Sequence, residues 1–272
     1  MNPQIKYVTL PTGVTVEYIE SGALGGVPLL LLHGLSDSWH SFLPLLPHLP
    51  RQVRTLAFTQ RGHGQSSKPR GGYNLQALAE DAKTFLDAMH IDRAVIVGHS
   101  MGAAVAALLA ASHPQQVAGL ALLGAFADFR ENGGAIALWQ DVRDLSDPIE
   151  PAFARAFQVS TIARMIDDDF IDLVVADSQA LPSFAWRGLT DAFLATNLPA
   201  AYRRIKAPTT LIWGDGDSFV PRSEQDAMLS AIRHATLHAL DDTGHAVHWD
   251  RPGETAAIIN ALVKSVAARR AA

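Results

Sequence analysis

A serine between two glycines is the residue of this chain best suited to nucleophilic chemistry. In the stretch Gly98-His99-Ser100-Met101-Gly102, a β-branched apolar run ends at the first glycine, and an Ala- and Leu-rich helical run begins after the serine. A side chain at either glycine would collide with a backbone that turns this tightly. The pattern predicts a strand, a sharp turn and a helix that raise the Ser100 hydroxyl above the sheet edge. Chance alone supplies this pattern in roughly one chain in ten of this length. The rest of the chain must therefore show whether Ser100 is a nucleophile.

A serine nucleophile needs a base to remove its proton and an acid to orient that base. The chain offers both in the order serine, acid, base. Asp217 lies four residues after a predicted strand that ends at Trp213, and His245 follows another predicted strand, 236–240. Parallel strands bring their carboxyl ends to one edge of a sheet, where ligands bind. We therefore expect Ser100, Asp217 and His245 to meet there.

The elements that must position these residues alternate between apolar strands and helical runs. Eight runs read as strands: 7–10, 14–19, 27–32, 53–58, 94–97, 117–123, 209–213 and 236–240. The first two resemble an edge hairpin because they alternate around a Thr-Gly turn. The later runs are apolar without alternation, as expected of strands covered on both faces. The sequence predicts an α/β protein whose mostly parallel sheet is wound with helices on both faces.

The middle of the chain breaks this rhythm. Residues 125–200 contain 12 acidic and 5 basic residues, whereas the rest contains 15 and 17. Helical runs at 148–157, 162–176 and 184–194 have no strand-like run between them. We predict a core domain, 1–124 and 201–272, with a helical cap, 125–200, inserted after the sixth strand. Aromatic residues in the cap are candidates for lining a substrate pocket, although packing within the cap is an equal alternative: Phe126, Trp139, Phe157, Phe184 and Trp186.

Composition bounds the function further. The net charge of −5 and the lack of a basic tract argue against nucleic acid as a partner. No cysteine is present, which excludes disulfides and thiolate chemistry. The histidines are dispersed and show no metal-ligand spacing, so we expect no metal or cofactor. Apolar runs are too short to span a bilayer, and residues 1–13 lack the apolar core of a secretory signal. We expect a cytoplasmic protein that acts on a small molecule.

Five motifs together resemble the α/β-hydrolase superfamily, in its group of capped, cofactor-free, esterase-like enzymes. They occur in order along almost the whole chain: His33-Gly34, Arg61-Gly62-His63-Gly64, Gly98-His99-Ser100-Met101-Gly102, Gly214-Asp215-Gly216-Asp217 and Gly244-His245. This resemblance implies an α/β-hydrolase fold with an eight-stranded sheet. It also implies that Ser100 is the nucleophile, Asp217 the acid and His245 the base.

Acyl transfer also requires hydrogen-bond donors for the oxyanion of the tetrahedral intermediate. The backbone N–H of Met101, at the start of the helix after the serine, is one candidate. The resemblance implies that the N–H of Leu35 is the other. The chain departs from its relatives at Thr59, where they carry an aspartate that usually partners the arginine of the same loop. Arg61 is thus expected to lack its usual partner.

Three residues compete for the roles of acid and base. His248 lies three residues after His245, but it precedes a tryptophan and fits packing or hydrogen bonding near the pocket mouth. Asp215 competes with Asp217, and we expect it to stabilise the turn instead. Asp128 is an alternative acid because some relatives supply the acid after the sixth strand.

The serine at the elbow also selects among reactions. Haloalkane dehalogenases and epoxide hydrolases of this superfamily use aspartate there, so Ser100 disfavours both. We predict a serine hydrolase of the carboxylesterase or lactonase kind, acting on a small to medium apolar substrate. Two alternatives stay open: a hydrolase that cleaves the C–C bond of a diketone, and a ligand-binding receptor that keeps the fold.

Overall fold

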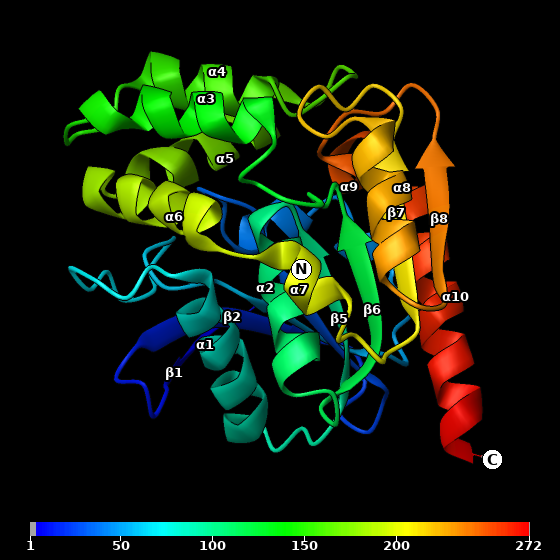
Figure 1. The fold of residues 1–272 in the computed structure, drawn as a ribbon. Helices are drawn as coiled ribbons and strands as arrows, with labels where there is room; N and C mark the ends of the chain where they lie inside the picture. The colour runs from blue at the N-terminus through cyan, green and yellow to red at the C-terminus, as the bar shows by residue number, and fades with distance from the viewer. Residues whose placement is uncertain (1–3, 272) are drawn as a thin grey trace.

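A single eight-stranded sheet forms the centre of the molecule. The computed structural model describes residues 4–271, and its strand order is β1-β2-β4-β3-β5-β6-β7-β8 (Figure 1). The strands are β1 (Ile5–Thr9), β2 (Thr15–Ser21), β3 (Pro28–Leu32), β4 (Arg54–Phe58), β5 (Ala94–His99), β6 (Val117–Leu123), β7 (Thr209–Gly214) and β8 (Ala235–Leu240). The pairings of β2 with β1 and β4 are antiparallel and the other five are parallel. The predicted α/β-hydrolase fold is thereby confirmed.

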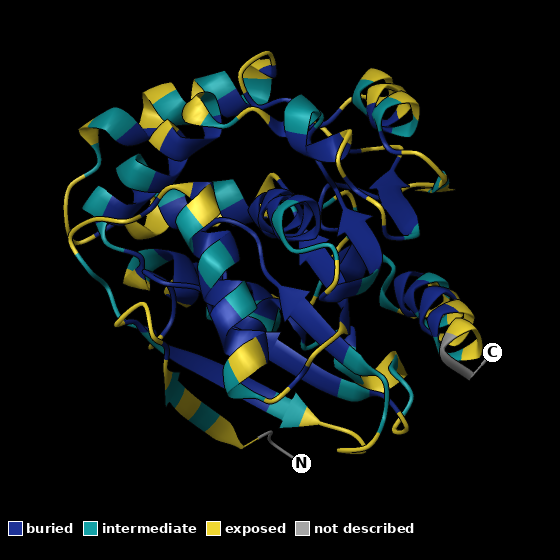
Figure 2. Ribbon diagram, turned by 60° about the horizontal axis from the view of Figure 1, so that its bottom comes forward, coloured by how far each residue is buried: buried dark blue, intermediate teal, exposed yellow. Residues whose placement is uncertain are grey.

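The central strands are buried on both faces. Successive side chains of a strand point to opposite sides, so neighbouring residues belong to different core clusters. Leu30 and Leu32 belong to a core cluster that also holds side chains of α1, α2, α7 and α8. Leu29 and Leu31 belong to a second cluster with α10. The core helices are α1 (Leu75–Ala88), α2 (Met101–Ser112), α8 (Arg222–Ala231), α9 (Val247–Asp250) and α10 (Pro252–Ala271). Figure 2 shows the inner strands as buried, in contrast to the exposed strand near the N-terminus.

A helical insertion, which we define as residues 124–208, joins β6 to β7 and lies over the carboxyl ends of the strands (Figure 1). No strand occurs in it, and all of its residues are described. Its helices are α3 (Gly133–Asp141), α4 (Pro151–Val159), α5 (Asp168–Ala180), α6 (Ser183–Ala195) and α7 (Leu198–Tyr202), with a short 3₁₀ turn, η3 (Val142–Asp144). The predicted division into core and cap includes residues 1–3 and 272, which lie outside the described residues.

Local capping explains where the insertion differs from the sequence prediction. The helix predicted from residue 162 begins only at Asp168, because the Asp167 side chain accepts a hydrogen bond from the N–H of Phe170 and caps the helix there. Helix α3 was not predicted, yet it is capped in the same way by Asn132, which accepts from Ala135 (2.8 Å).

Thr59 leaves Arg61 without a carboxylate in its own loop, as expected, but Arg61 has another partner. Its guanidinium makes a bidentate ion pair with Asp81 of α1, with Nε–Oδ2 and Nη2–Oδ1 distances of 2.5 and 2.7 Å. Arg61 also donates to the carbonyl oxygen of Gly72 (3.0 Å). Thr59 instead accepts a hydrogen bond from the backbone N–H of Trp39 (3.2 Å). A helix outside the loop thus supplies the carboxylate that pairs with Arg61.

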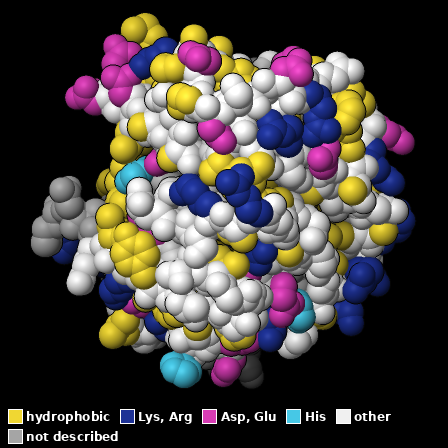
Figure 3. All heavy atoms as spheres, turned by 90° about the vertical axis from the view of Figure 1, so that its left-hand side faces the viewer, with side chains coloured by type: hydrophobic (Ala, Val, Ile, Leu, Met, Phe, Trp, Pro, Cys, Tyr) yellow, Lys and Arg dark blue, Asp and Glu magenta, His cyan; other side chains and the backbone are white. Residues whose placement is uncertain are grey.

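The outer surface carries both signs of charge. On the face shown in Figure 3, acidic and basic side chains are interspersed among apolar and neutral atoms. Between residues 4 and 271, no helix is long and apolar enough to cross a membrane.

Candidate active site

Ser100 occupies a strained turn between β5 and α2. Its backbone has φ +52° and ψ −115°, in the positive-φ region that non-glycine residues rarely adopt. An added Cβ at Gly98 would collide with the carbonyl oxygen of Gly102, and one at Gly102 would collide with that of Leu32. The two glycines therefore permit the close approach of α2 to the sheet. Such strain is typical of functional sites.

The structure brings His245 and Asp217 into direct contact. The Nδ1 atom of His245 lies 2.9 Å from Oδ2 of Asp217, and the aspartate side chain is fully buried. Asp217 Oδ1 accepts hydrogen bonds from the backbone N–H groups of Phe219 (2.9 Å) and Val220 (3.0 Å). Because a carboxylate only accepts hydrogen bonds, the proton of the neutral imidazole lies on Nδ1, which leaves the Nε2 lone pair available as a base.

The competing residues have other partners. His248 Nε2 lies 3.0 Å from the hydroxyl of Ser41. Asp215 accepts from the N–H of Thr243 (3.4 Å) in the turn. Asp128 forms an ion pair with Arg130 (2.6 Å).

The two backbone N–H groups expected to bind the oxyanion belong to residues close to Ser100. Leu35 lies in the loop after β3 and lines the same cavity as Ser100. Met101 is the first residue of α2, and the first N–H groups of a helix have no partner within it. A helix N-terminus also favours negative charge. These are the two donors named in the sequence analysis.

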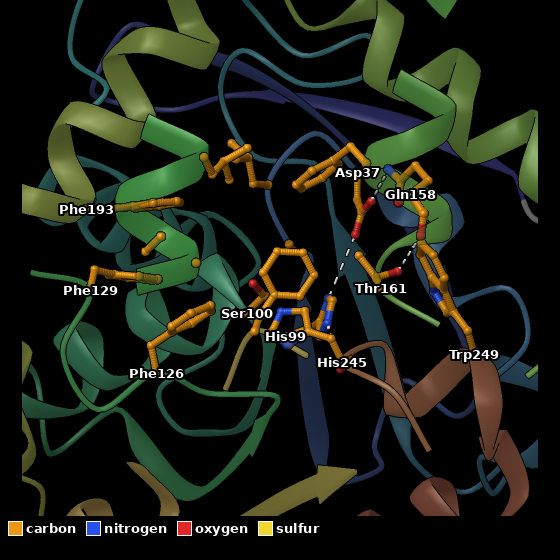
Figure 4. Close-up of a pocket in the computed structure, with 17 residues that line it drawn as sticks. Asp37, His99, Ser100, Phe126, Phe129, Gln158, Thr161, Phe193, His245 and Trp249 are labelled. Carbon is orange, nitrogen blue, oxygen red and sulfur yellow. Dashed lines mark hydrogen bonds and ion pairs between the residues drawn. The ribbon is translucent and has the colours of Figure 1, made fainter. Parts of the chain in front are cut away.

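A cavity lies between the sheet edge and the helical insertion. The 17 residues that line it are Gly34, Leu35, Asp37, His99, Ser100, Phe126, Phe129, Gly134, Ala135, Leu138, Phe157, Gln158, Thr161, Phe193, Phe219, His245 and Trp249. Figure 4 shows two unlike walls. Phe126, Phe129 and Phe193 lie on one side of Ser100, whereas Asp37 and Gln158 lie on the other.

Only two of the five predicted pocket aromatics, Phe126 and Phe157, line this cavity. The expectation is wrong for the other three. Trp139 donates to Asp191 at the surface (2.8 Å), and Phe184 packs against the Tyr73 ring at 6.1 Å. Trp186 is fully buried among the insertion helices. Sequence position within the insertion does not show which face of each helix points down to the sheet.

The sequence analysis missed most of the lining. Phe129, Phe193 and Phe219 complete the apolar wall, and Asp37 and Gln158 form the polar one. A usable signal existed for Asp37 alone, because it lies three residues after the His33-Gly34 motif, in the loop that also carries Leu35.

One carboxylate fastens the insertion to the loop that carries His245. Asp250 Oδ2 accepts hydrogen bonds from the N–H of Gly244 (2.6 Å) and of Ala163 (2.9 Å). Its Oδ1 accepts from the N–H of Arg164 (3.3 Å). Asp250 therefore fixes the residue before His245 and the loop between α4 and α5 at the same time.

Comparison with known proteins places the chain in a family. Residues 27–252 match the family described as alpha/beta hydrolase fold. The chain belongs to the α/β-hydrolase family. The matched segment includes Ser100, Asp217 and His245, and the protein is accordingly a hydrolase of α/β fold.

Relatives of this hydrolase differ in their reactions. It is 28% identical over 275 residues to 2-hydroxymuconate semialdehyde hydrolase of Pseudomonas sp. (strain CF600), covering 95% of this chain and 93% of the relative. It is 30% identical over 260 residues to the dihydrolipoyllysine-residue acetyltransferase component of the acetoin cleaving system of Cupriavidus necator, covering 93% of this chain and 66% of the relative. A solved esterase from Exiguobacterium antarcticum shares the fold, with a TM-score of 0.86, 20% identity and coverage of 96% and 100%.

Burial keeps the imidazoles around this hydrolase's site neutral. It lowers the pKa of His63 to about 4 and that of His248 to about 3, because a charged ring would lose its hydration. The pKa values of His33 and His99 are lowered well below the usual value for the same reason. These four rings are therefore neutral at physiological pH.

Asp37 is the unusual acid of the site. Burial raises the pKa of its carboxyl to about 7, and hydrogen bonds from Gln158 and Ser41 oppose this rise only in part. The Gln158 amide donates to Oδ1 and the Ser41 hydroxyl donates to Oδ2, both at 3.0 Å. In the residues that the structure describes, no group of three or more His, Cys, Asp or Glu could hold a metal ion.

Proposed function

We propose that this protein is a serine hydrolase that cleaves a carboxylic ester or lactone through an acyl-enzyme intermediate. One observation carries the proposal. A single cavity contains Ser100 on its strained turn and His245, whose Nδ1 is fixed by a buried aspartate. A nucleophile, a base and an acid that orients the base are the parts that acyl transfer needs.

The reaction begins when the Ser100 hydroxyl attacks the carbonyl carbon and Nε2 of His245 takes its proton. Asp217 stabilises the resulting imidazolium. The N–H groups of Leu35 and Met101 bind the oxyanion, a contribution of about 3 kcal/mol for each donor. His245 then protonates the leaving alcohol, and the acyl-enzyme forms. A water molecule activated by the same imidazole releases the acid and restores Ser100.

The apolar wall supports a small to medium apolar substrate. Phe126 and Phe129 pack at a centroid distance of 4.6 Å, and Phe129 stacks on Phe193 at 4.2 Å with an interplanar angle of 12°. Ligand sites are mostly apolar with a few placed polar groups. An acyl chain or lactone ring would thus lie against these rings while its carbonyl meets Ser100.

Hydrolysis of p-nitrophenyl butyrate, together with labelling by a fluorophosphonate, tests the proposal. We expect the pure protein to do both, and Ser100→Ala to lose labelling and about 10⁵-fold or more in kcat. Ser112→Ala, at the other end of the same helix, is the matched control and should behave as the wild type. The proposal is wrong if Ser100→Ala keeps its activity, or if the wild type shows neither reaction.

A second candidate is cleavage of a C–C bond beside a carbonyl. The named activity of the Pseudomonas relative, which matches 95% of this chain, favours it. Against it, the 17 residues lining the cavity include no lysine or arginine to receive an acidic substrate. Incubation with a vinylogous diketone distinguishes C–C bond cleavage from ester hydrolysis, because an esterase leaves that compound intact.

A further inference from the structure

Two hydrogen-bond acceptors face each other in the polar wall. Nε2 of His99 lies 3.3 Å from the carbonyl oxygen of His245. A carbonyl oxygen only accepts hydrogen bonds, so Nε2 carries the proton and Nδ1 presents a lone pair. Nδ1 is buried and has no hydrogen-bond partner among the described residues. An unsatisfied buried polar atom is costly, which points to a group that the chain itself does not supply.

Oδ2 of Asp37 lies 3.9 Å from this nitrogen, too far for a direct hydrogen bond. The dashed line between the two residues in Figure 4 marks this separation. Gly34 borders the gap: an added Cβ there would lie 2.9 Å from Nδ1 and 3.2 Å from Oδ2. Both residues line the cavity, and Gly34 has no side chain to fill the gap between them.

The chemistry of the pair favours a hydroxyl group. With its pKa near 7, Asp37 is partly protonated in neutral solution. A protonated carboxyl donates to the oxygen of a hydroxyl, and the hydroxyl then donates to Nδ1 of His99. The buried Nδ1 atom of His99 thereby gains the hydrogen-bond partner that it lacks. A substrate carboxylate would instead meet an acid in a cavity whose 17 lining residues include no cationic side chain.

The Asp37–His99 pair lies beside residues that are proposed to act on the reacting carbonyl. Gly34 precedes Leu35, a proposed oxyanion donor, and His99 precedes the nucleophile. We propose that Asp37 and His99 form a subsite for a hydroxyl group close to the scissile carbonyl, so that hydroxylated esters are preferred over their deoxy analogues. This inference rests on the proposed function and adds a substrate class to it.

Matched esters test the preference. Methyl 2-hydroxybutyrate, methyl 3-hydroxybutyrate, methyl 3-aminobutyrate and methyl butyrate have the same carbon skeleton. We expect kcat/KM for one of the hydroxy esters to exceed that for methyl butyrate by about tenfold or more, since a site built for a hydroxyl rejects the analogue that lacks it. Equal values for the hydroxy and deoxy esters, or a larger value for the amino ester, would overturn the proposal.

Two variants probe the subsite independently. Asp37→Leu removes the carboxyl, and Gly34→Ala places a methyl group beside both acceptors. Each should reduce the hydroxy-to-deoxy ratio of kcat/KM to near one. Asp81→Asn is the matched control: Asp81 is also buried and pairs with Arg61 (2.5 Å), but it does not line the cavity, so the ratio should stay high. Should Asp37→Leu fail to fold, Gly34→Ala still decides the matter.

A binding measurement separates this inference from the proposed function. Ser100→Ala protein, which cannot turn over by the proposed mechanism, should bind methyl 3-hydroxybutyrate or its 2-hydroxy isomer more tightly than methyl butyrate in calorimetry. Hydrolysis without any hydroxyl preference would refute only the subsite. Hydroxyl-selective binding without hydrolysis would refute only the esterase mechanism.

Discussion

The sheet edge and the helical insertion both line the cavity, but they supply different kinds of side chain. The sheet edge contributes Ser100, His245, His99 and Asp37, which are polar or titratable, besides the apolar residues Leu35, Phe219 and Trp249. Apart from Gln158 and Thr161, the insertion contributes phenylalanine, leucine, alanine and glycine. None of the eleven histidines lies between residues 124 and 208.

This difference separates reaction from recognition. Groups that move protons must hold their geometry, and the parallel strands of the sheet fix the ends from which such groups project. The insertion covers these groups with apolar side chains, whose shape decides what fits. It is fastened to the sheet edge by Asp250 and by the hydrogen bond between Gln158 and Asp37.

The largest expected effect is the loss of kcat when Asp217, the proposed acid at the sheet edge, is substituted. Asp217→Asn should lower kcat by about 10⁴-fold, because an amide favours the wrong tautomer of His245. Asp215→Asn, two residues away and outside this contact, should leave kcat nearly unchanged. Steady-state kinetics with p-nitrophenyl butyrate measures both. A comparable loss in Asp128→Asn would instead show that the acid comes from the loop after β6.

Removal of the link between the two regions should have the next largest effect. Asp250→Ala leaves three N–H groups unpaired, and hydrogen bonds to a charged group contribute about 1.5–3 kcal/mol each. We expect the free energy of unfolding to fall by about 4.5 kcal/mol or more and kcat to fall about tenfold as His245 loses its fixed position. Urea denaturation and kinetics measure the two effects.

Asp226→Ala is the control for this link. Asp226 pairs with Arg222 on the exposed surface of α8, where such pairs contribute at most about 1 kcal/mol. If Asp250→Ala were as stable and active as this control, the insertion would not depend on the link.

A cavity made in the apolar wall should change selectivity rather than chemistry. Phe193→Ala enlarges the wall, so the ratio of kcat/KM for p-nitrophenyl octanoate over butyrate should rise about tenfold. Phe184→Ala is the matched control, since that ring lies near the start of the same helix, α6, but packs on Tyr73 outside the cavity. An equal shift in both variants would mean that the insertion responds as a whole, and the wall would not set selectivity.

The smallest expected effect is on how the free energy of unfolding depends on pH. The folded-state pKa of His63 is about 4, below its unfolded value near 6.5. The unfolded chain therefore binds more protons between these values, and the free energy of unfolding falls as pH falls through this window. His63→Gln should reduce this slope by about 1.4 kcal/mol per pH unit. Urea unfolding at pH 7, 6 and 5 measures it, and an unchanged slope would contradict the assignment of a neutral, buried ring.

Much of the core could be predicted because local sequence rules operate there. Apolar runs without alternation marked the parallel strands, and two glycines around Ser100 marked a turn that tolerates no side chain. The structure has all eight strands in the predicted regions. Strand order and register then bring the loops after β5, β7 and β8 to one edge.

The insertion was less predictable because its contacts are distant in sequence. Phe157 and Trp186 are both insertion aromatics, yet only the first lines the cavity. The partner of Arg61 is likewise Asp81, twenty residues away on a helix of the core. Helical periodicity identifies an apolar face but does not show which neighbour covers it.

The sequence by itself determined the strands, the turn at Ser100 and the order of serine, acid and histidine, because these follow from backbone sterics and side-chain periodicity. Only the tertiary structure decided the environment of that serine. Asp37 follows the His33-Gly34 motif and His99 lies within the motif around Ser100, but their chemistry arises because folding buries the two side chains with Oδ2 and Nδ1 3.9 Å apart. Desolvation depends on every element packed around a group, so no local stretch of sequence can specify it.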